Sequence, residues 1–388
     1  MPDPNALRRI AEARLPRYLA ELESLVNVDC GSYTPEGVNR VADVVADALG
    51  ELGASVERLV HRPDVGRPQL GDLVVGRIEG EGPRLLLIGH MDTVFDPGTA
   101  AARPYRADGD RATGPGVTDM KSGLLAGLHA IAALHEAGER PTITFVANPD
   151  EEIGSPFSTP TIRSLAPEHD VALVLECARA NGDIVSARKG IADFHLELVG
   201  RAAHAGVEPE KGRSAILEAA HQVLALHALN GRWSTVTVNV GVIHGGTRPN
   251  VVAERCELHV DLRAATADAF DAASAEVERL AASPTIEGVT VGVRRSAGHP
   301  PMEKTDASAR LVALAAGIAA ELGFELHDAA TGGASDANTT AALGLPTLDG
   351  LGPIGGDDHS VDEWLDLTSV VPRTALLAGL IGRIGEAL

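Results

Sequence analysis

PRLLLIGH (83–90), MKSGLLAGLHAIAALHEAG (120–138) and TITFVAN (142–148) together predict a strand, a helix and a second strand. The two strand segments are apolar on consecutive residues, which is typical of strands covered on both faces. The helix is expected to end at Gly138. A strand–helix–strand unit indicates a sheet that is parallel at least in part.

The flanking segments extend this sheet and cover it. GDLVVGRI (71–78) and DVALVLE (170–176) predict further strands, and apolar spacing predicts helices over 5–27 and 37–52. Pro16 interrupts the first helix, so we expect a kink or two short helices there. The C-terminal segment, about 367–387, is again predicted to be helical.

The pattern changes between residues 188 and 297. Strands with period-two alternation appear, as where Asp193, His195 and Glu197 alternate with apolar neighbours, and 212–230 and 267–282 are predicted helices. The order of strands and helices suits an α+β ferredoxin-like domain with one solvated sheet face. We therefore predict an α/β fold with a mixed, mostly parallel sheet covered by helices, divided into 1–187 and 298–388 by an inserted domain at 188–297.

Composition limits the partners. The formal net charge is −21, which argues against nucleic acid or an anionic membrane surface as a partner. The N-terminal segment has no unbroken apolar run of the kind found in secretion signals, and Cys30, Cys177 and Cys256 are too few and too far apart for a disulfide framework. A cytoplasmic location is the expectation.

Several acids and histidines stand at predicted strand ends. His90 and Asp92 close one strand, where residues i and i+2 point to the same side, and Glu176 closes another. Glu151 and Glu152 follow the strand that ends near Asn148. Chance for the His-x-Asp pair and an exposed acidic loop for the glutamates are the simpler alternatives.

Two more candidates lie in glycine-rich loops. Asp119 could instead cap a helix, and His359 could be a surface histidine. Taken together, however, the histidines and carboxylates form an oxygen and nitrogen ligand set suited to Zn²⁺ or a related divalent ion. Two close metals sharing a carboxylate can hold a hydrolytic water, and a spare glutamate can move its proton. The spacing therefore predicts a metal hydrolase.

At these residues the chain resembles the dizinc amidohydrolases and peptidases that include glutamate carboxypeptidases, aminoacylases, acetylornithine deacetylase and succinyl-diaminopimelate desuccinylase. The resemblance covers essentially the whole chain, and its motifs, in order, are GHMDTVF, GPGVTDMKSG, PDEEIGS, VLE, GRAAHAG, RPN and GDDHS. The folate-cleaving glutamate carboxypeptidase type is the most similar, through LECARANGDIVSARKG, RAAHAGVEPEKGRSAI and TGGASDANTTAALGLP.

The resemblance implies two Zn²⁺ per subunit, with Co²⁺ or Mn²⁺ as substitutes, in a zinc-peptidase-like catalytic domain. His90 and Glu176 would bind one ion, Glu152 and His359 the other, and Asp119 would bridge them. Asp92 would orient His90. Glu151 would be the general base and then the acid, and the Asp119–Met120 peptide bond would be cis.

The inserted segment resembles the family's lid and dimerisation domain, which implies a homodimer. His204 would stabilise the oxyanion in the neighbouring subunit's site. Asn250 and Arg263 would contact the substrate carboxylate, although Arg263 could also be a surface charge at a strand end. The loop around Gly333 would line the substrate side.

Some positions depart from the glutamate carboxypeptidase pattern. Ile184 stands where that type has a lysine, and His299 stands where it has an arginine; Arg188 or Lys189 could substitute. Cys177 could be a soft ligand or a buried structural thiol. Four histidines in predicted helices are assigned no role, and they are His129, His135, His221 and His227.

We therefore expect a hydrolase that cleaves an amide bond beside a free carboxylate, in a small N-acyl amino acid or short peptide. A dipeptidase or aminopeptidase of the same family is one alternative. An inactive metal-binding or peptide-binding relative is another, although a complete ligand set with Glu151 argues against it.

Overall fold

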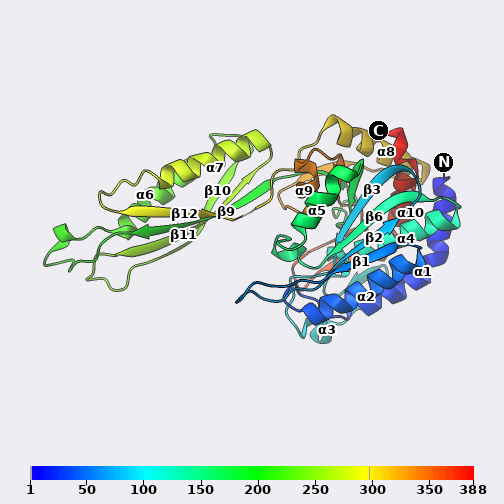
Figure 1. Cartoon of the computed structure of the whole chain (residues 1–388), viewed down its shortest axis with the longest axis horizontal. Coiled ribbons are helices and arrows are strands. Elements are labelled where there is room, and N and C mark those ends of the chain that lie inside the picture. Colours follow the sequence, from blue (N-terminus) through cyan, green and yellow to red (C-terminus); the bar gives the residue numbers. More distant parts are fainter. Residues whose placement is uncertain (1, 297) are drawn as a thin grey trace. The chain divides into compact units, whose positions relative to one another are not determined.

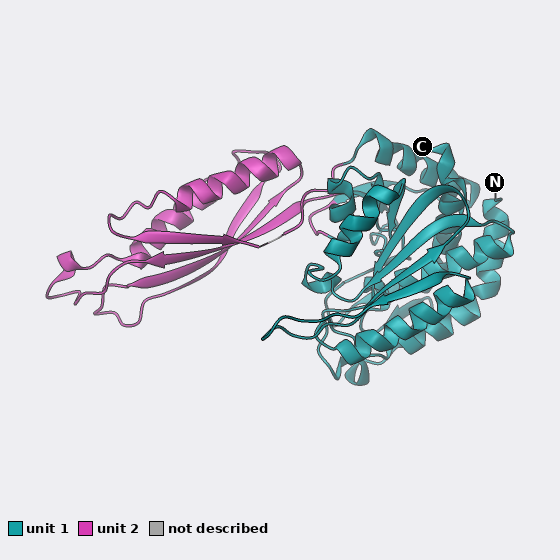
Figure 2. Ribbon diagram, in the orientation of Figure 1, with its two compact units in different colours: residues 1–186, 304–330, 335–388 teal, residues 187–303, 331–334 magenta. Residues whose placement is uncertain are grey.

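The computed structural model describes residues 2–296 and 298–388, and the chain divides into two compact units (Figure 2). Unit 1 comprises Met1–Ser186, Lys304–Ala330 and Ser335–Leu388. Unit 2 comprises Ala187–Glu303 and Thr331–Ala334. The predicted boundary at residue 297 lies outside the described residues.

Unit 1 is built on a six-stranded mixed sheet. In spatial order its strands are β1 (Ser55–Leu59), β2 (Leu73–Ile78), β6 (Pro141–Asn148), β3 (Glu81–His90), β7 (Val171–Val174) and β14 (Thr347–Leu348). The β1–β2 and β2–β6 pairs are antiparallel, and the β6–β3, β3–β7 and β7–β14 pairs are parallel. The predicted α/β class with a mostly parallel sheet is confirmed.

Helices cover both faces of this sheet (Figure 1). They are α1 (Pro4–Val26), α2 (Pro35–Glu51), α4 (Ser122–Glu136), α5 (Thr159–Leu165), α8 (Asp306–Glu321), α9 (Asp336–Ala342) and α10 (Val370–Arg383). Leu85 and Leu87 of β3 pack into the main core with α1, α4 and α10, while Leu86 and Ile88 are equally buried on the other face. Consecutive apolar residues are therefore needed because neither face of β3 meets water.

Two helices in unit 1 differ from what proline content or apolar composition alone would suggest. α1 runs through Pro16 as one helix, so a division into two short helices is wrong. The segment Leu367–Glu386, which contains α10, is long and apolar enough to cross a membrane by length and composition, but 67% of its most apolar 18-residue stretch is buried inside the protein. Burial of this kind is typical of a core helix.

Smaller elements complete unit 1 and the segments next to it. A four-stranded sheet has the order β15 (Gly355–Gly356), β16 (Trp364–Asp366), β5 (Arg111–Thr113) and β4 (Arg106–Asp108). The short helix α3 (Thr99–Ala102) precedes β4, and β8 (Ile184–Arg188) pairs with β13 (Asp328–Thr331). The hairpin from β15 to β16 carries His359.

Unit 2 is a four-stranded antiparallel sheet with two helices on one face. Its elements in chain order are β9 (Gly190–Val199), α6 (Ala215–His227), β10 (Thr237–Gly245), β11 (Arg255–Ala264), α7 (Ala267–Ala281) and β12 (Thr290–Arg295). The spatial order of the strands is β10-β11-β9-β12, which is the ferredoxin-like arrangement. Phe194, Leu196 and Leu198 pack with the helices, so the alternating residues between them lie on the uncovered face.

Candidate functional site

Three neighbouring parallel strands place their carboxyl ends side by side in unit 1. β3 lies between β6 and β7, with His90 opposite Asn148 and Ile88 opposite Val174. His90 ends β3, and a short 3-10 turn at Glu151–Ile153 follows β6. Glu176 lies two residues beyond β7. Polar residues gather here because the strands are parallel and end at one edge of the sheet.

Asp119 lies between two histidines. Its Oδ1 atom is 3.0 Å from His90 Nε2, and its Oδ2 atom is 3.1 Å from His359 Nε2. Asp119 is not a helix cap, since Lys121 precedes the first residue of α4. The peptide bond from Asp119 to Met120 is cis, as the resemblance implies. One carboxylate thus presents a different oxygen to each imidazole.

The β15–β16 hairpin brings His359 to this point. Gly355 allows the close approach, because a β-carbon there would lie 1.9 Å from Thr118 Oγ1. His359 itself has a φ of 61°, in the left-handed region that few non-glycine residues adopt. Its Nε2 atom also lies 3.1 Å from Glu152 Oε2.

The predicted ligands therefore form two groups that share Asp119. His90, Asp119 and Glu176 make one group, in which His90 Nε2 is 3.7 Å from Glu176 Oε1. Asp119, Glu152 and His359 make the other. Within each group one candidate ligand atom per residue lies within 4.8 Å of the others.

The charges of these groups fit divalent cations. Burial raises the pKa of Glu176 to about 7, against the opposing effect of His90. Hydrogen bonds to Asp119 and Glu152 raise the pKa of His359 to about 11. The two groups thus favour added positive charge. Divalent metal ions would supply this charge by taking the place of bound protons. Imidazole nitrogens and carboxylate oxygens are the donors that Zn²⁺ and related ions use.

Glu151 and Glu152 are adjacent but differently engaged. Glu152 lies against His359, whereas no hydrogen bond engages the Glu151 carboxylate in the part of the chain that the structure describes. Burial, and next the charge of Glu176, raise the pKa of Glu151 well above its usual range. A carboxylate that is unpaired, close to the ligand groups and high in pKa is suited to accept a proton.

Asp92 connects His90 to the turn that carries Glu151 and Glu152. His90 Nδ1 donates to the main-chain oxygen of Asp92 over 3.0 Å, which leaves Nε2 free to face Asp119. The Asp92 carboxylate is 3.4 Å from the same ring nitrogen. It accepts the backbone amides of Glu151 and Glu152, both at 3.2 Å, and the hydroxyl of Ser32 at 2.6 Å. Asp92 therefore orients both His90 and the turn that carries the glutamates.

Glu363 supports the site and was not singled out from the sequence. Its buried carboxylate accepts the backbone amides of Gly116, Thr118 and Asp119 at 2.8, 2.9 and 3.1 Å. Burial raises the pKa of Glu363 to about 7. In the sequence this residue stands in an acidic loop, and only its position directly before the strand residue Trp364 could have distinguished it.

Replacing Glu363 with glutamine is expected to lower the free energy of unfolding by about 1–3 kcal/mol, because the side-chain amide would face the Gly116 N–H and leave it unsatisfied. Loosening the Asp119 loop should also weaken metal binding by about tenfold. Thermal denaturation and metal titration measure the two effects. Glu325→Gln, at an exposed acid of unit 1, is the control, and equal behaviour of the two variants would contradict this role.

Asp336 is a second buried acid, and it lies three residues after Gly333, in the loop that the resemblance assigns to the substrate side. It is the first residue of α9, and its carboxylate accepts hydrogen bonds from the side-chain amide of Asn148 and from the hydroxyl of Ser155, the latter at 2.6 Å. Burial raises its pKa to about 7. Asp336 thus fixes the segments on both sides of the Glu151–Glu152 turn.

Unit 2 contains the remaining predicted residues. His204 and Asn250 are exposed on neighbouring segments, where the Ala205 amide donates to the Asn250 carbonyl over 3.0 Å. The Gly206 amide donates to His204 Nδ1 over 3.1 Å, so a neutral His204 carries its proton on Nε2. That arrangement leaves Nε2–H available as a donor.

Two arginines of unit 2 hold the Thr331–Ala334 segment. Arg263 is paired with Asp261 at 3.1 Å and donates to the carbonyl of Gly332 at 2.9 Å. The buried Arg188 donates to the carbonyl of Gly333 at 3.1 Å. The substrate-binding roles of Asn250, Arg263 and Gly333 stay predictions.

The positions discussed above as departures from the family pattern, and Cys177, are affected mainly by burial. Ile184 is fully buried in the main core. Burial lowers the pKa of His299, and its amide pairs with the Ile191 carbonyl at 2.9 Å. Burial raises the pKa of the Cys177 thiol well above its usual range, which favours a structural thiol over a metal ligand.

Comparisons with known proteins agree with this architecture. Residues 86–383 match the model of Peptidase family M20/M25/M40. Carboxypeptidase G2 from Pseudomonas sp. (strain RS-16) is 33% identical over 387 residues, which cover 98% of this chain and 92% of that protein. Acetylornithine deacetylase from Vibrio cholerae is 30% identical over 268 residues, covering 64% and 68%. The structure of aminopeptidase PepT from Bacillus cereus ATCC 10987 matches with a TM-score of 0.77 and 24% identity, covering 95% of this chain and 98% of that one.

Proposed function

The chain belongs to peptidase family M20/M25/M40 and is a hydrolase, and from this we propose that it cleaves an amide bond beside a free carboxylate in a metal-dependent reaction. The substrate would be a short peptide or an N-acyl amino acid. The names of two relatives, a carboxypeptidase and an acetylornithine deacetylase, support this range.

One observation carries the proposal. The two oxygens of Asp119 face different histidines, while the carboxylate of Glu151, the neighbour of the ligand candidate Glu152, has no hydrogen bond or ion pair among the described residues. A carboxylate shared by two ligand groups, beside a second carboxyl group that can exchange protons, suits a hydrolytic site with two ions.

The chain's own residues have distinct tasks in this reaction. Two divalent ions, held by His90, Asp119, Glu152, Glu176 and His359, would polarise the substrate carbonyl and lower the pKa of the attacking water. Glu151 takes the proton from that water and then delivers it to the leaving amine. Asp92 keeps His90 and the Glu151 turn in position throughout.

Unit 2 supplies the recognition groups in this proposal. The exposed Nε2–H of His204 donates to the developing oxyanion of a neighbouring subunit, which requires a homodimer. Asn250 and the guanidinium of Arg263 bind the substrate carboxylate. Unit 2 thereby acts as a lid and dimerisation domain.

A panel of substrates with Zn²⁺, Co²⁺ or Mn²⁺ added tests the function. We expect kcat/KM for N-acyl amino acids or dipeptides with a free carboxylate to exceed that of the same compounds with an amidated carboxylate by about 100-fold, because amidation removes the charge that the guanidinium of Arg263 would bind. Dependence on a free amine instead would indicate an aminopeptidase. The absence of turnover with every metal would contradict the proposal.

A further inference from the structure

The uncovered face of the unit 2 sheet carries opposed pairs of like side chains. Three such pairs join β9 and β11, and they are Asp193 with Asp261, His195 with His259, and Glu197 with Glu257. Like charges placed directly opposite one another destabilise a sheet. Positively charged side chains or ions bound to this face would therefore stabilise it.

Arginines meet part of this need. Arg263 pairs with Asp261 at 3.1 Å, and Arg255 pairs with Glu197 at 2.8 Å. Glu257 is left with an imidazole, since its one ion-pair partner in the described part of the chain is His195, at 3.5 Å. In the described part of the chain, four of the six opposed side chains thus form no ion pair with an arginine or lysine, and they are Asp193, His195, Glu257 and His259. Arg294 donates a hydrogen bond to His195 instead.

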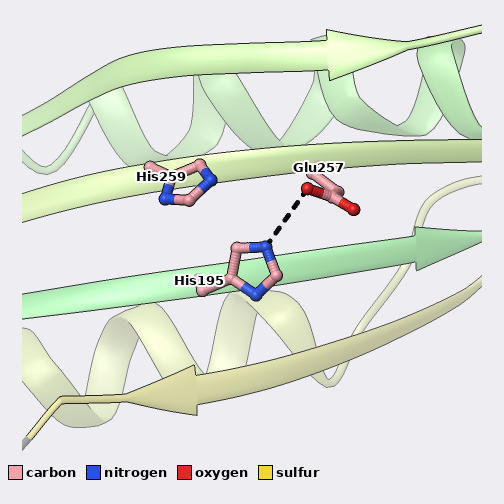
Figure 3. Close-up of side chains that lie close together, drawn as sticks. All are labelled: His195, Glu257 and His259. Carbon is pink, nitrogen blue, oxygen red and sulfur yellow. Dashed lines mark ion pairs between the residues drawn. The ribbon is translucent and has the colours of Figure 1, made fainter. Parts of the chain in front are cut away.

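Three of these side chains, His195, Glu257 and His259, converge, as Figure 3 shows, in front of the sheet and away from its helices. The ring centroids of His195 and His259 are 4.7 Å apart, and one ligand atom from each of the three residues lies within 4.8 Å of the others. Because His195 and His259 are directly opposed and Glu257 lies two residues before His259 on the same strand, the register itself brings them together.

We propose that His195, Glu257 and His259 bind one divalent transition-metal ion, which links β9 to β11. Two imidazoles and a carboxylate suit Zn²⁺, Ni²⁺ or Cu²⁺, with water completing the coordination. The site lies wholly in unit 2 and shares no residue with the proposed catalytic ligands. It therefore does not depend on the proposed hydrolysis.

Arg294 sets a condition on this binding. It lies opposite His195 on β12 and donates to His195 Nδ1 over 2.6 Å. A neutral His195 in this arrangement keeps its proton on Nε2, the atom that faces Glu257. Metal binding through Nε2 needs that proton on Nδ1 instead, where a guanidinium cannot accept it. The exposed Arg294 must therefore move aside, and it competes with the metal.

Metal counting on the full-length chain tests the site. After equilibrium dialysis at about 10 µM free Zn²⁺, we expect the wild type to retain one more ion per chain than the variant His195→Gln with His259→Gln. Glu257→Gln should weaken the extra site by at least about tenfold. His227→Gln, at an exposed histidine on α6, should bind like the wild type.

Two further measurements separate this ion from the catalytic ones. The one-ion difference should persist when Asp119→Asn is present in both proteins, and amide hydrolysis should be the same in the wild type and the double-histidine variant. Arg294→Gln should tighten binding by about threefold or more, because a glutamine carbonyl can accept from Nδ1–H. Equal ion counts in the wild type and the double variant would overturn the proposal, as would weaker binding in Arg294→Gln.

Discussion

Replacing Glu151 with glutamine is expected to lower kcat by about 10²–10⁴-fold while leaving the metal content unchanged. Glutamine keeps the shape of the side chain but cannot take a proton from water. Metal content should hold because Glu151, unlike Glu152, belongs to neither ligand group of the site among the described residues. Steady-state kinetics and metal analysis of the same preparation measure both quantities.

The neighbouring residue provides the matched control. Glu152→Gln is expected to lose metal as well as activity, since it removes a carboxylate oxygen 3.1 Å from His359 Nε2. A Glu151→Gln enzyme with activity close to the wild type would refute the assignment of the base. Loss of metal in that variant would show that Glu151 itself contributes to metal binding.

Replacing Asp119 with asparagine should affect both metal positions at once. Each oxygen of Asp119 faces a different histidine, so a neutral amide removes the shared charge and offers only one acceptor oxygen. We expect affinity to fall at both positions and kcat/KM to fall by about 10⁴-fold or more, because both ions act on the same reaction. Metal titration followed by kinetics tests this.

His359→Asn is the comparison for this variant. It removes a ligand from one group only, so the metal position of His90 and Glu176 should still bind an ion. If Asp119→Asn also lost only one ion, with the other bound as in the wild type, Asp119 would not be shared. Unchanged affinity at both positions would exclude it as a ligand.

The sequence could place part of this site because parallel strands end at one edge. His90 and Glu176 close apolar runs, and their meeting follows from the order of β6, β3 and β7. His359 is different, since it reaches Asp119 through a hairpin whose approach depends on Gly355. Its glycine-rich loop made His359 a candidate ligand, but spacing along the chain carries no information about its approach to Asp119. That pairing was indicated by the resemblance to a family.

Buried charged residues account for most of what was missed. Glu363 stands among acids that predict a solvated loop, yet it accepts three backbone amides from the segment before α4. Arg373 lies in an apolar helix and donates to the carbonyls of Gly350, Gly352 and Gly182. Their partners are backbone groups far away in the chain, and no side-chain pattern encodes such bonds.

The unit 2 sheet shows the same limit in another form. Alternation correctly placed Asp193, His195 and Glu197 on a polar face, because the strand period is two. Alternation could not show that each of these residues would lie directly opposite a residue of the same type on β11, since that depends on the register of the two strands.

Asp92 has a consequence for how the proposed catalytic ions bind. Its main-chain oxygen holds His90, and its carboxylate holds the turn that carries Glu152, so one residue sets the geometry of a ligand from each group. If two ions bind as proposed, filling one position would fix the residue that also holds a ligand of the other. We therefore expect occupancy of the two positions to be thermodynamically linked, and by reciprocity each ion would change the affinity for the other by the same factor.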